Sequence, residues 1–289
     1  MSVSPVCSCL SCPTHAEAAG RPAACGFYPS SSMTDAQWEL LEPLLPPPGN
    51  TAGHGGRPEK HPRRRVLDAI FYLVRGGLAW RQLPAEFPPA TTVYGLFHRW
   101  AAAGAWAHLH DALRDRTRLR AGRHPHPTAA VIDSASVRGA DTVPARSRGY
   151  DAGKKVNGRK RHIAVDTGGL LLAVVVTLAG IQDRDGAVRL LAALRAKFST
   201  IALVWADGGY AGRLVAWAKT VLGFAVTIVK RTDDPTGFRV IPRRWVVERT
   251  LAWISKHRRC VRDYETRPDH SEAMVYIAMI MTLSRRLAR

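Results

Sequence analysis

The chain has 289 residues, of which 46% are hydrophobic, enough to bury a core and to form more than one domain. Its 42 Lys and Arg residues against 23 Asp and Glu give a formal net charge of +19, which favours a polyanionic partner: DNA, RNA or an anionic membrane surface. The five cysteines do not form a disulfide framework, and no apolar run reaches the roughly 20 residues of a membrane helix. We therefore expect a cytoplasmic protein.

The first 32 residues differ from the rest of the chain. They are rich in Ser, Pro, Ala and Cys and show no periodicity, so we predict a disordered extension over residues 1–32. The run CSCLSC at 7–12 matches half of a metal site, but no second pair at zinc-finger spacing follows, and reduced cysteines are the preferred interpretation. The character changes at Met33, which we predict to be the true start of translation.

Helical patterns fill residues 33–125. Thr34 is the predicted N-cap of the first helix, which prolines 46–48 end, and further helices are expected at 62–74, from about residue 91, and at 106–119. This small helical domain resembles a helix-turn-helix DNA reader, although the gap at 76–90 exceeds the usual turn; a helical cap on a catalytic domain is the alternative. Its outer faces are expected to carry Arg63, Arg64, Arg65 and Arg99.

Beyond the breaker HPHPT at 124–128, strands and helices alternate. Apolar runs predict five strands, at 129–137, 162–166, 170–179, 201–206 and 224–230. Helical spacing predicts helices at 185–198, 212–222, 243–259 and 271–288. A hairpin followed by alternating strands and helices predicts an α/β domain over residues 126–289, with a mixed sheet flanked by helices.

Three acidic residues lie in settings that suit a metal site. Asp133 lies within an apolar strand, Asp207 directly follows another strand, and Glu248 lies inside a helical pattern. Carboxylates of this kind hold Mg²⁺, and two such ions roughly 3.5–4 Å apart cleave phosphodiesters. The glycines at 208 and 209 allow a substrate backbone to approach Asp207 closely.

Basic residues flank Glu248 along its predicted helix. Arg244 lies one turn before it on the same face, Arg259 lies within about 20° of that face, and Lys256 is displaced by about 80°. An ordinary surface salt bridge between Arg244 and Glu248 is the simpler alternative. Asp183 and Asp185 precede a helix and are interpreted as N-cap and first-turn residues.

Six stretches in order resemble the DDE transposases of bacterial insertion sequences, in particular the insertion sequence 5 family. They are MTDAQWELLEPLLPP, AIFYLVRGGLAWRQLP, VIDSASVRG, RGYDAGKKVNGRKRHIAVDTGGLL, VWADGGYAG and RRWVVERTLAWISKHRR. The resemblance implies a ribonuclease-H-like domain in which Asp133, Asp207 and Glu248 bind two Mg²⁺ ions, with Mn²⁺ as a substitute. It also implies a Tyr, Arg, Glu, Lys signature, of which only the Arg and Glu are present: Ile241 and Ser255 occupy the other two positions, with Lys256 and Arg259 as the nearest replacements.

The reaction implied by the resemblance is Mg²⁺-dependent cutting at the element's ends, followed by attack of the freed 3′ hydroxyl on target DNA. The partner would be double-stranded DNA, bound by a homodimer or larger assembly near the nucleoid. The basic segment 154–162 is expected to contact phosphates through Lys154, Lys155, Arg159, Lys160 and Arg161. A structure-specific nuclease without strand transfer, and an inactive transposase-derived DNA-binding protein, are the alternatives.

Overall fold

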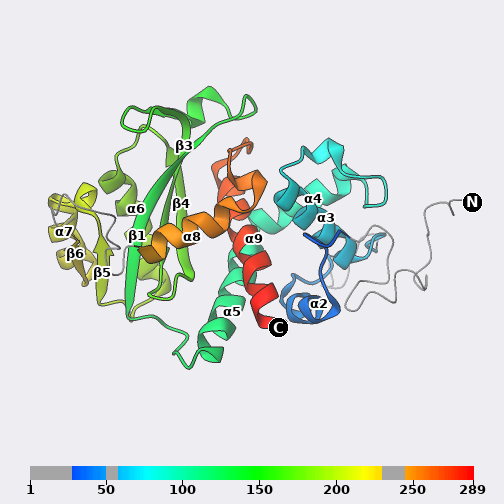
Figure 1. Cartoon of the computed structure of the whole chain (residues 1–289), viewed down its shortest axis with the longest axis horizontal. Helices are drawn as coiled ribbons and strands as arrows, with labels where there is room; N and C mark the ends of the chain where they lie inside the picture. Colours follow the sequence, from blue (N-terminus) through cyan, green and yellow to red (C-terminus); the bar gives the residue numbers. More distant parts are fainter. Residues whose placement is uncertain (1–27, 50–57, 230–244) are drawn as a thin grey trace, which may run out of the picture. The chain divides into compact units, whose positions relative to one another are not determined.

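A computed structural model describes residues 28–49, 58–229 and 245–289 of the chain (Figure 1). The chain divides into two compact units. Unit 1 comprises the residues up to Leu113 together with 257–259 and 276–289, and unit 2 comprises 114–256 and 260–275. The division therefore falls before the predicted boundary at 125. Helices α5 (Ala105–Arg120) and α9 (Pro268–Leu287) each contribute residues to both units.

Unit 1 is helical. Besides its parts of α5 and α9 it contains α2 (Asp35–Leu41), α3 (Arg63–Gly76) and α4 (Ala90–Ala102), with short 3₁₀ turns at Glu42–Leu44 and Trp80–Gln82. The predicted start of α2 is confirmed, because the Thr34 hydroxyl accepts from the Gln37 amide at 3.3 Å and the Gln37 side chain accepts from the Thr34 amide at 3.0 Å. Gly77 ends α3 in the left-handed region at φ 75°, where glycine is favoured.

Residues 28–32 belong to unit 1 rather than to a disordered extension. The ring of Tyr28 packs against those of Tyr72 and Phe87, with centroids 4.3 and 5.5 Å apart, and Ser31 and Ser32 are buried. Aromatic packing of this kind is invisible to a composition argument, which explains why the sequence assigns residues 28–32 to the extension. The cysteines at 7, 9, 12 and 25 lie outside the described residues.

Three of the four arginines expected on the outer faces of unit 1 are engaged locally, whereas Arg99 is exposed as expected. Arg63 pairs with Glu59 at 2.6 Å and Arg64 pairs with Asp35 at 2.6 Å. The guanidinium of Arg65 lies 5.1 Å from the centroid of the Phe87 ring. These contacts hold the ends of α2 and α3 in place. These three arginines are therefore less available to contact DNA.

Unit 2 is built on a six-stranded mixed sheet in the order β2–β3–β1–β5–β6, with β4 also paired to β3. Strands β1, β3 and β4 pair antiparallel, whereas β1, β5 and β6 pair parallel, so the predicted mixed sheet is confirmed. The strands are β1 (Ala129–Arg138), β2 (Gly149–Asp151), β3 (Val156–Val165), β4 (Leu171–Leu178), β5 (Leu203–Ala206) and β6 (Ala225–Ile228). The β3 strand begins six residues before the expected position 162, and β2 was not anticipated.

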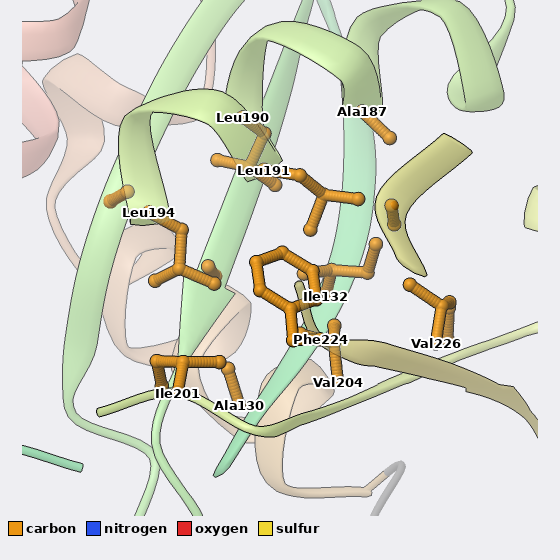
Figure 2. Packing of buried hydrophobic residues seen from close by; sticks show 14 of the residues in the cluster. Ala130, Ile132, Ala187, Leu190, Leu191, Leu194, Ile201, Val204, Phe224 and Val226 are labelled. Carbon is orange, nitrogen blue, oxygen red and sulfur yellow. The ribbon is translucent and has the colours of Figure 1, made fainter. Parts of the chain in front are cut away.

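Helix α6 (Asp183–Lys197) covers one face of the sheet. Figure 2 shows Leu190 and Leu194 of this helix packed against Ile132 of β1 and Val204 of β5. Near the same core lie α7 (Arg213–Trp217) and a π-helical turn at Ala218–Leu222. Burying large apolar side chains such as these stabilises a fold by about 1.5–3 kcal/mol each.

Helix α8 (Trp245–Ser255) packs against β1 and β3. Its buried residues Val246, Val247 and Ile254 are not part of the cluster beneath α6, so α8 covers the opposite face. This second covered face positions the candidate site, because the side chains of a strand alternate between the two faces of its sheet.

Candidate active site

Asp133 lies within β1, and Asp207 directly follows the neighbouring parallel strand β5. The last paired residues of β1 and β5 are Val131 and Trp205, and each aspartate follows two residues later. Adjacent strands are about 4.8 Å apart. Because Ile132 packs into the core under α6, the alternation of side chains directs Asp133 toward the face covered by α8. Asp207 lies just beyond β5, and its side chain turns toward the amide of Gly209.

Backbone amides fix both carboxylates. Asp133 Oδ1 accepts a hydrogen bond from the amide of Ser134 at 2.7 Å, and Asp207 Oδ1 accepts one from the amide of Gly209 at 2.9 Å. The second bond makes Asp207 the N-cap of a short 3₁₀ turn, Gly208–Tyr210, that begins where β5 ends. Both side chains are half-buried, so they are held rigidly yet remain open to solvent on one side.

Glu248 lies in the first turn of α8 and is exposed. Two neighbours tie this helix to the turn between β3 and β4: Arg249 donates to the carbonyl of Gly168 at 2.8 Å and Thr250 donates to that of Gly169 at 2.7 Å. The helix that carries Glu248 therefore lies on the face of the sheet toward which Asp133 is directed. Among the residues that the structure describes, however, no three His, Cys, Asp or Glu side chains come close enough to hold a metal ion by themselves.

The predicted basic stripe along the helix is only partly present. Arg244 lies outside the described residues. Lys256 is exposed just beyond the last turn of α8. Arg259 was placed on the Glu248 face by assuming a helix that continues to 259, but α8 ends at Ser255, and Arg259 is buried in unit 1, where it donates to the carbonyl of Leu78 at 2.6 Å. That prediction is therefore wrong on geometric grounds.

The basic segment 154–162 divides into an exposed turn and a buried strand. Lys154 and Lys155 lie in the turn between β2 and β3 and are exposed. Arg159, Lys160 and Arg161 lie within β3 with exposed fractions of 0%, 5% and 3%. The prediction that these three residues contact phosphates is therefore wrong.

Each buried cation has partners that explain its position. Arg159 donates to the carbonyl oxygens of Glu265 at 2.7 Å and Thr266 at 3.0 Å, and Arg161 donates to that of Cys260 at 2.5 Å. Charged groups are tolerated in a protein interior only when they are paired and hydrogen-bonded in this way. Both arginines thus hold the segment before α9 against the sheet.

Asp183 is an acidic residue beside the candidate site whose contacts the sequence does not predict. Its Oδ1 accepts hydrogen bonds from the Ser134 hydroxyl at 2.8 Å and from Lys160 Nζ at 2.9 Å. Burial alone would raise the pKa of this carboxyl, but the bonds from Lys160 and Ser134 lower it overall. Because Ser134 is 49 residues away in the sequence, no local spacing could have singled out Asp183, which looks like an ordinary first-turn acid.

Tyr210 is buried beside these carboxylates. Burial raises the pKa of its hydroxyl, and the negative charges of Asp133, Asp183 and Asp207 raise it further, opposed by the nearby hydroxyl of Ser134. The Tyr210 hydroxyl makes no hydrogen bond within the described part of the chain. A neutral donor is thus available at a place where negative charge is concentrated.

The donor set fits a hard divalent cation. Mg²⁺ keeps several waters and is held in proteins by one or two carboxylates together with substrate phosphates. Asp133 and Asp207 supply two carboxylates at adjacent positions, anchored by backbone amides and open to solvent on one side. A complete cage of protein ligands is not required for this ion.

The mixed sheet with its flanking helices fits the domain of a DDE transposase. Residues 124–283 match the family described as "Transposase DDE domain", and residues 33–110 match "Putative transposase of IS4/5 family (DUF4096)". The chain belongs to the DDE transposase family of insertion sequences, a nucleic-acid-cleaving class of enzymes, and the ribonuclease-H-like fold expected of that family agrees with the observed sheet.

Two relatives come from Burkholderia cepacia. The chain is 38% identical over 114 residues to "Insertion element IS402 uncharacterized 16.2 kDa protein", covering 37% of this chain and 72% of that protein. It is 30% identical over 139 residues to "Putative transposase for insertion sequence element IS402", covering 46% of this chain and 65% of the relative. None of the helices in the described ranges is long and apolar enough to cross a membrane.

Proposed function

We propose that this chain cleaves DNA at the ends of an insertion sequence and joins the freed 3′ ends to target DNA in a Mg²⁺-dependent reaction. The observation that carries the proposal is the pair Asp133, within β1, and Asp207, at the end of the neighbouring parallel strand β5, with α8 packed against β1. The net charge of +19 supports double-stranded DNA as the partner. The reaction takes place in the cytoplasm, near the nucleoid.

In this proposal Asp133 and Asp207 hold the cation, and Glu248 is the third carboxylate of the site. When bound, Mg²⁺ or its substitute Mn²⁺, as a pair of ions, supplies activation of the attacking oxygen and stabilisation of the leaving oxygen. The amides of Ser134 and Gly209 keep the aspartate side chains in one rotamer, so the site is formed before DNA binds.

The DNA backbone is bound by exposed cations. Lys154 and Lys155, at the tip of the β2–β3 hairpin, and Lys256, after α8, are positioned in unit 2 to contact phosphates. Arg244 is proposed to contact the DNA end because it matches the family signature. Such contacts add affinity but little sequence preference. We propose that two or more copies act together when both ends of the element are bound.

Product analysis tests the proposal. DNA carrying the gene's flanking genomic sequence is incubated with the protein and Mg²⁺ or EDTA, and the 3′ ends are mapped. Mg²⁺-dependent cuts at the element's ends, with 3′ ends joined to new DNA, are expected for the wild type and not for Glu248→Gln, which should still bind DNA. Cutting without joining would favour a nuclease, and binding without cutting would favour an inactive DNA-binding copy.

A further inference from the structure

Asp183 is placed unlike an ordinary first-turn residue. It opens α6, whose N-cap is Gln182, and that cap side chain makes no capping bond. Asp183 Oδ1 accepts from Ser134 and Lys160 rather than from the amides of its own helix. Because Asp185 also lies in the first turn and complements the helix dipole, helix stabilisation does not account for the bonds of Asp183.

The other oxygen of Asp183 points toward the Asp207 loop. A Cβ atom added to Gly209 would lie 4.0 Å from Asp183 Oδ2 and 3.1 Å from Asp207 Oδ1, so both oxygens lie close to Gly209. The Asp183 side chain is 31% exposed, which leaves this oxygen accessible to water. Lys160, in contrast, is almost fully buried, and its Nζ donates to Oδ1 of Asp183.

A second observation marks this region as a binding site. The Tyr210 side chain is only 1% exposed, yet its hydroxyl lacks a hydrogen-bond partner among the described residues. It lies near Asp133, Asp183 and Asp207. A buried polar group left unpaired costs about 1–3 kcal/mol, so this hydroxyl is expected to take a partner such as water beside the Ser134 hydroxyl, whose proximity lowers its pKa.

We propose that Asp183 is a positioning residue that accepts hydrogen bonds from water molecules on the cation held by Asp133 and Asp207, with the Tyr210 hydroxyl in the same water network. This inference rests on the proposed function. It agrees with the finding that no three acids within the described ranges form a direct ligand set, since Mg²⁺ retains waters that need partners of their own. Ser134 then links Asp133 to Asp183, because its amide donates to Asp133 and its hydroxyl donates to Asp183.

The test measures Mn²⁺ binding to the full-length protein by electron paramagnetic resonance, without DNA and without an activity readout. We expect Asp183→Asn to weaken Mn²⁺ binding about 10- to 100-fold, the usual effect of removing a second partner of a metal ligand. Asp185→Asn is the matched control, with the same change of charge in the same helical turn, and should alter binding less than about twofold. Equal affinities for the two variants would overturn the proposal.

Two further variants keep the result interpretable. Tyr210→Phe removes only an unpaired hydroxyl, so a purely structural role predicts unchanged or higher stability with unchanged Mn²⁺ affinity, whereas our proposal predicts weaker binding at undiminished stability. It also replaces Asp183→Asn if that variant does not fold. Asp133→Asn should abolish Mn²⁺ binding; normal binding by this variant would refute the proposed function itself, independently of Asp183.

Discussion

The imidazole of His162 occupies the space that any side chain on Gly186 would need. A Cβ atom added at 186 would lie 2.2 Å from two atoms of that ring. His162 is fully buried in β3, where its Nε2 lies 3.0 Å from the Thr177 hydroxyl, so the ring has no room to move. Glycine at 186 is thus required by packing between α6 and β3 rather than by backbone conformation.

Gly186→Ala is expected to destabilise the protein by about 1–3 kcal/mol, the usual cost of overpacking. The measurement is urea unfolding of the wild type and the variant. Gly95→Ala is the control, since it is also a glycine within a helix and its nearest neighbour is the far end of an arginine side chain, 3.5 Å away. Wild-type stability in Gly186→Ala would show that His162 can leave its place.

Stability should rise with pH through the titration of His162. Burial lowers the pKa of this imidazole to about 4; the negative charge of Asp183 opposes this shift and the positive charge of Lys160 adds to it. Between pH 4 and the ordinary value of about 6.5 the unfolded chain binds a proton that the folded chain does not, so stability increases with pH in this window. Unfolding free energies of wild type and His162→Gln from pH 4 to 7 test this: the variant should show a shallower rise.

Asp68 in unit 1 should contribute the opposite slope. Burial raises the pKa of its carboxyl to about 6, although the amide of Met33 donates to it at 2.8 Å. The folded chain then retains a proton that the unfolded chain loses above pH 4, so this group reduces stability as pH rises from 4 to 6. Asp68→Asn should be more stable relative to wild type at pH 8 than at pH 4; the same difference at both values would contradict the assignment.

The lysines of the β2–β3 turn should contribute to DNA binding through charge alone. Replacing Lys154 and Lys155 with Ala is expected to weaken binding to specific and unrelated DNA alike, and to reduce the slope of log affinity against log salt by about 1 to 2. Fluorescence anisotropy over a range of salt concentrations measures both quantities. Lys219→Ala, an exposed lysine elsewhere in unit 2, is the control; an equal effect there would remove any special role of the turn.

Arg159 should behave differently despite being only a few residues away. Its guanidinium lies 3.4 Å from the Asp263 carboxylate, and both side chains are fully buried. Arg159→Ala leaves a buried carboxylate without this partner, which typically costs about 3–5 kcal/mol. We expect a loss of thermal stability with normal DNA affinity of the folded protein at low temperature. Weaker binding at full stability would restore Arg159 to the DNA surface.

The contrast between these residues shows what could be predicted from the sequence. The strand carrying Asp133 and the strand before Asp207 are short apolar runs, and their pairing follows from the alternation of strands and helices. The burial of Arg159 and Lys160 could not be predicted, because their partners come from segments far away in the sequence. Local charge density indicates a surface only where tertiary partners are absent.

The predicted ends of helices are wrong for a related reason. The sequence predicts that α8 continues to 259, yet it ends at Ser255 and a separate 3₁₀ turn, Arg258–Cys260, follows. The predicted N-cap at Asp183 is wrong by one residue, because Gln182 caps α6 and Asp183 lies in its first turn, and its contacts with distant residues could not be predicted. Periodicity predicts which elements form, whereas hydrogen bonds between distant segments decide where they end and what they contact.

In the proposed mechanism Asp133 and Asp207 together hold the cation on which DNA cleavage depends. The most direct test is cleavage of DNA bearing the element's ends by Asp133→Asn and Asp207→Asn, with DNA affinity measured in parallel, and by Asp207→Cys in Mg²⁺ and in Mn²⁺. We expect both Asn variants to bind DNA and not to cut it, and Asp207→Cys to cut in Mn²⁺ but not in Mg²⁺, because a thiolate is a poor ligand for Mg²⁺. Wild-type cutting in Mg²⁺ by either Asn variant would contradict the claim.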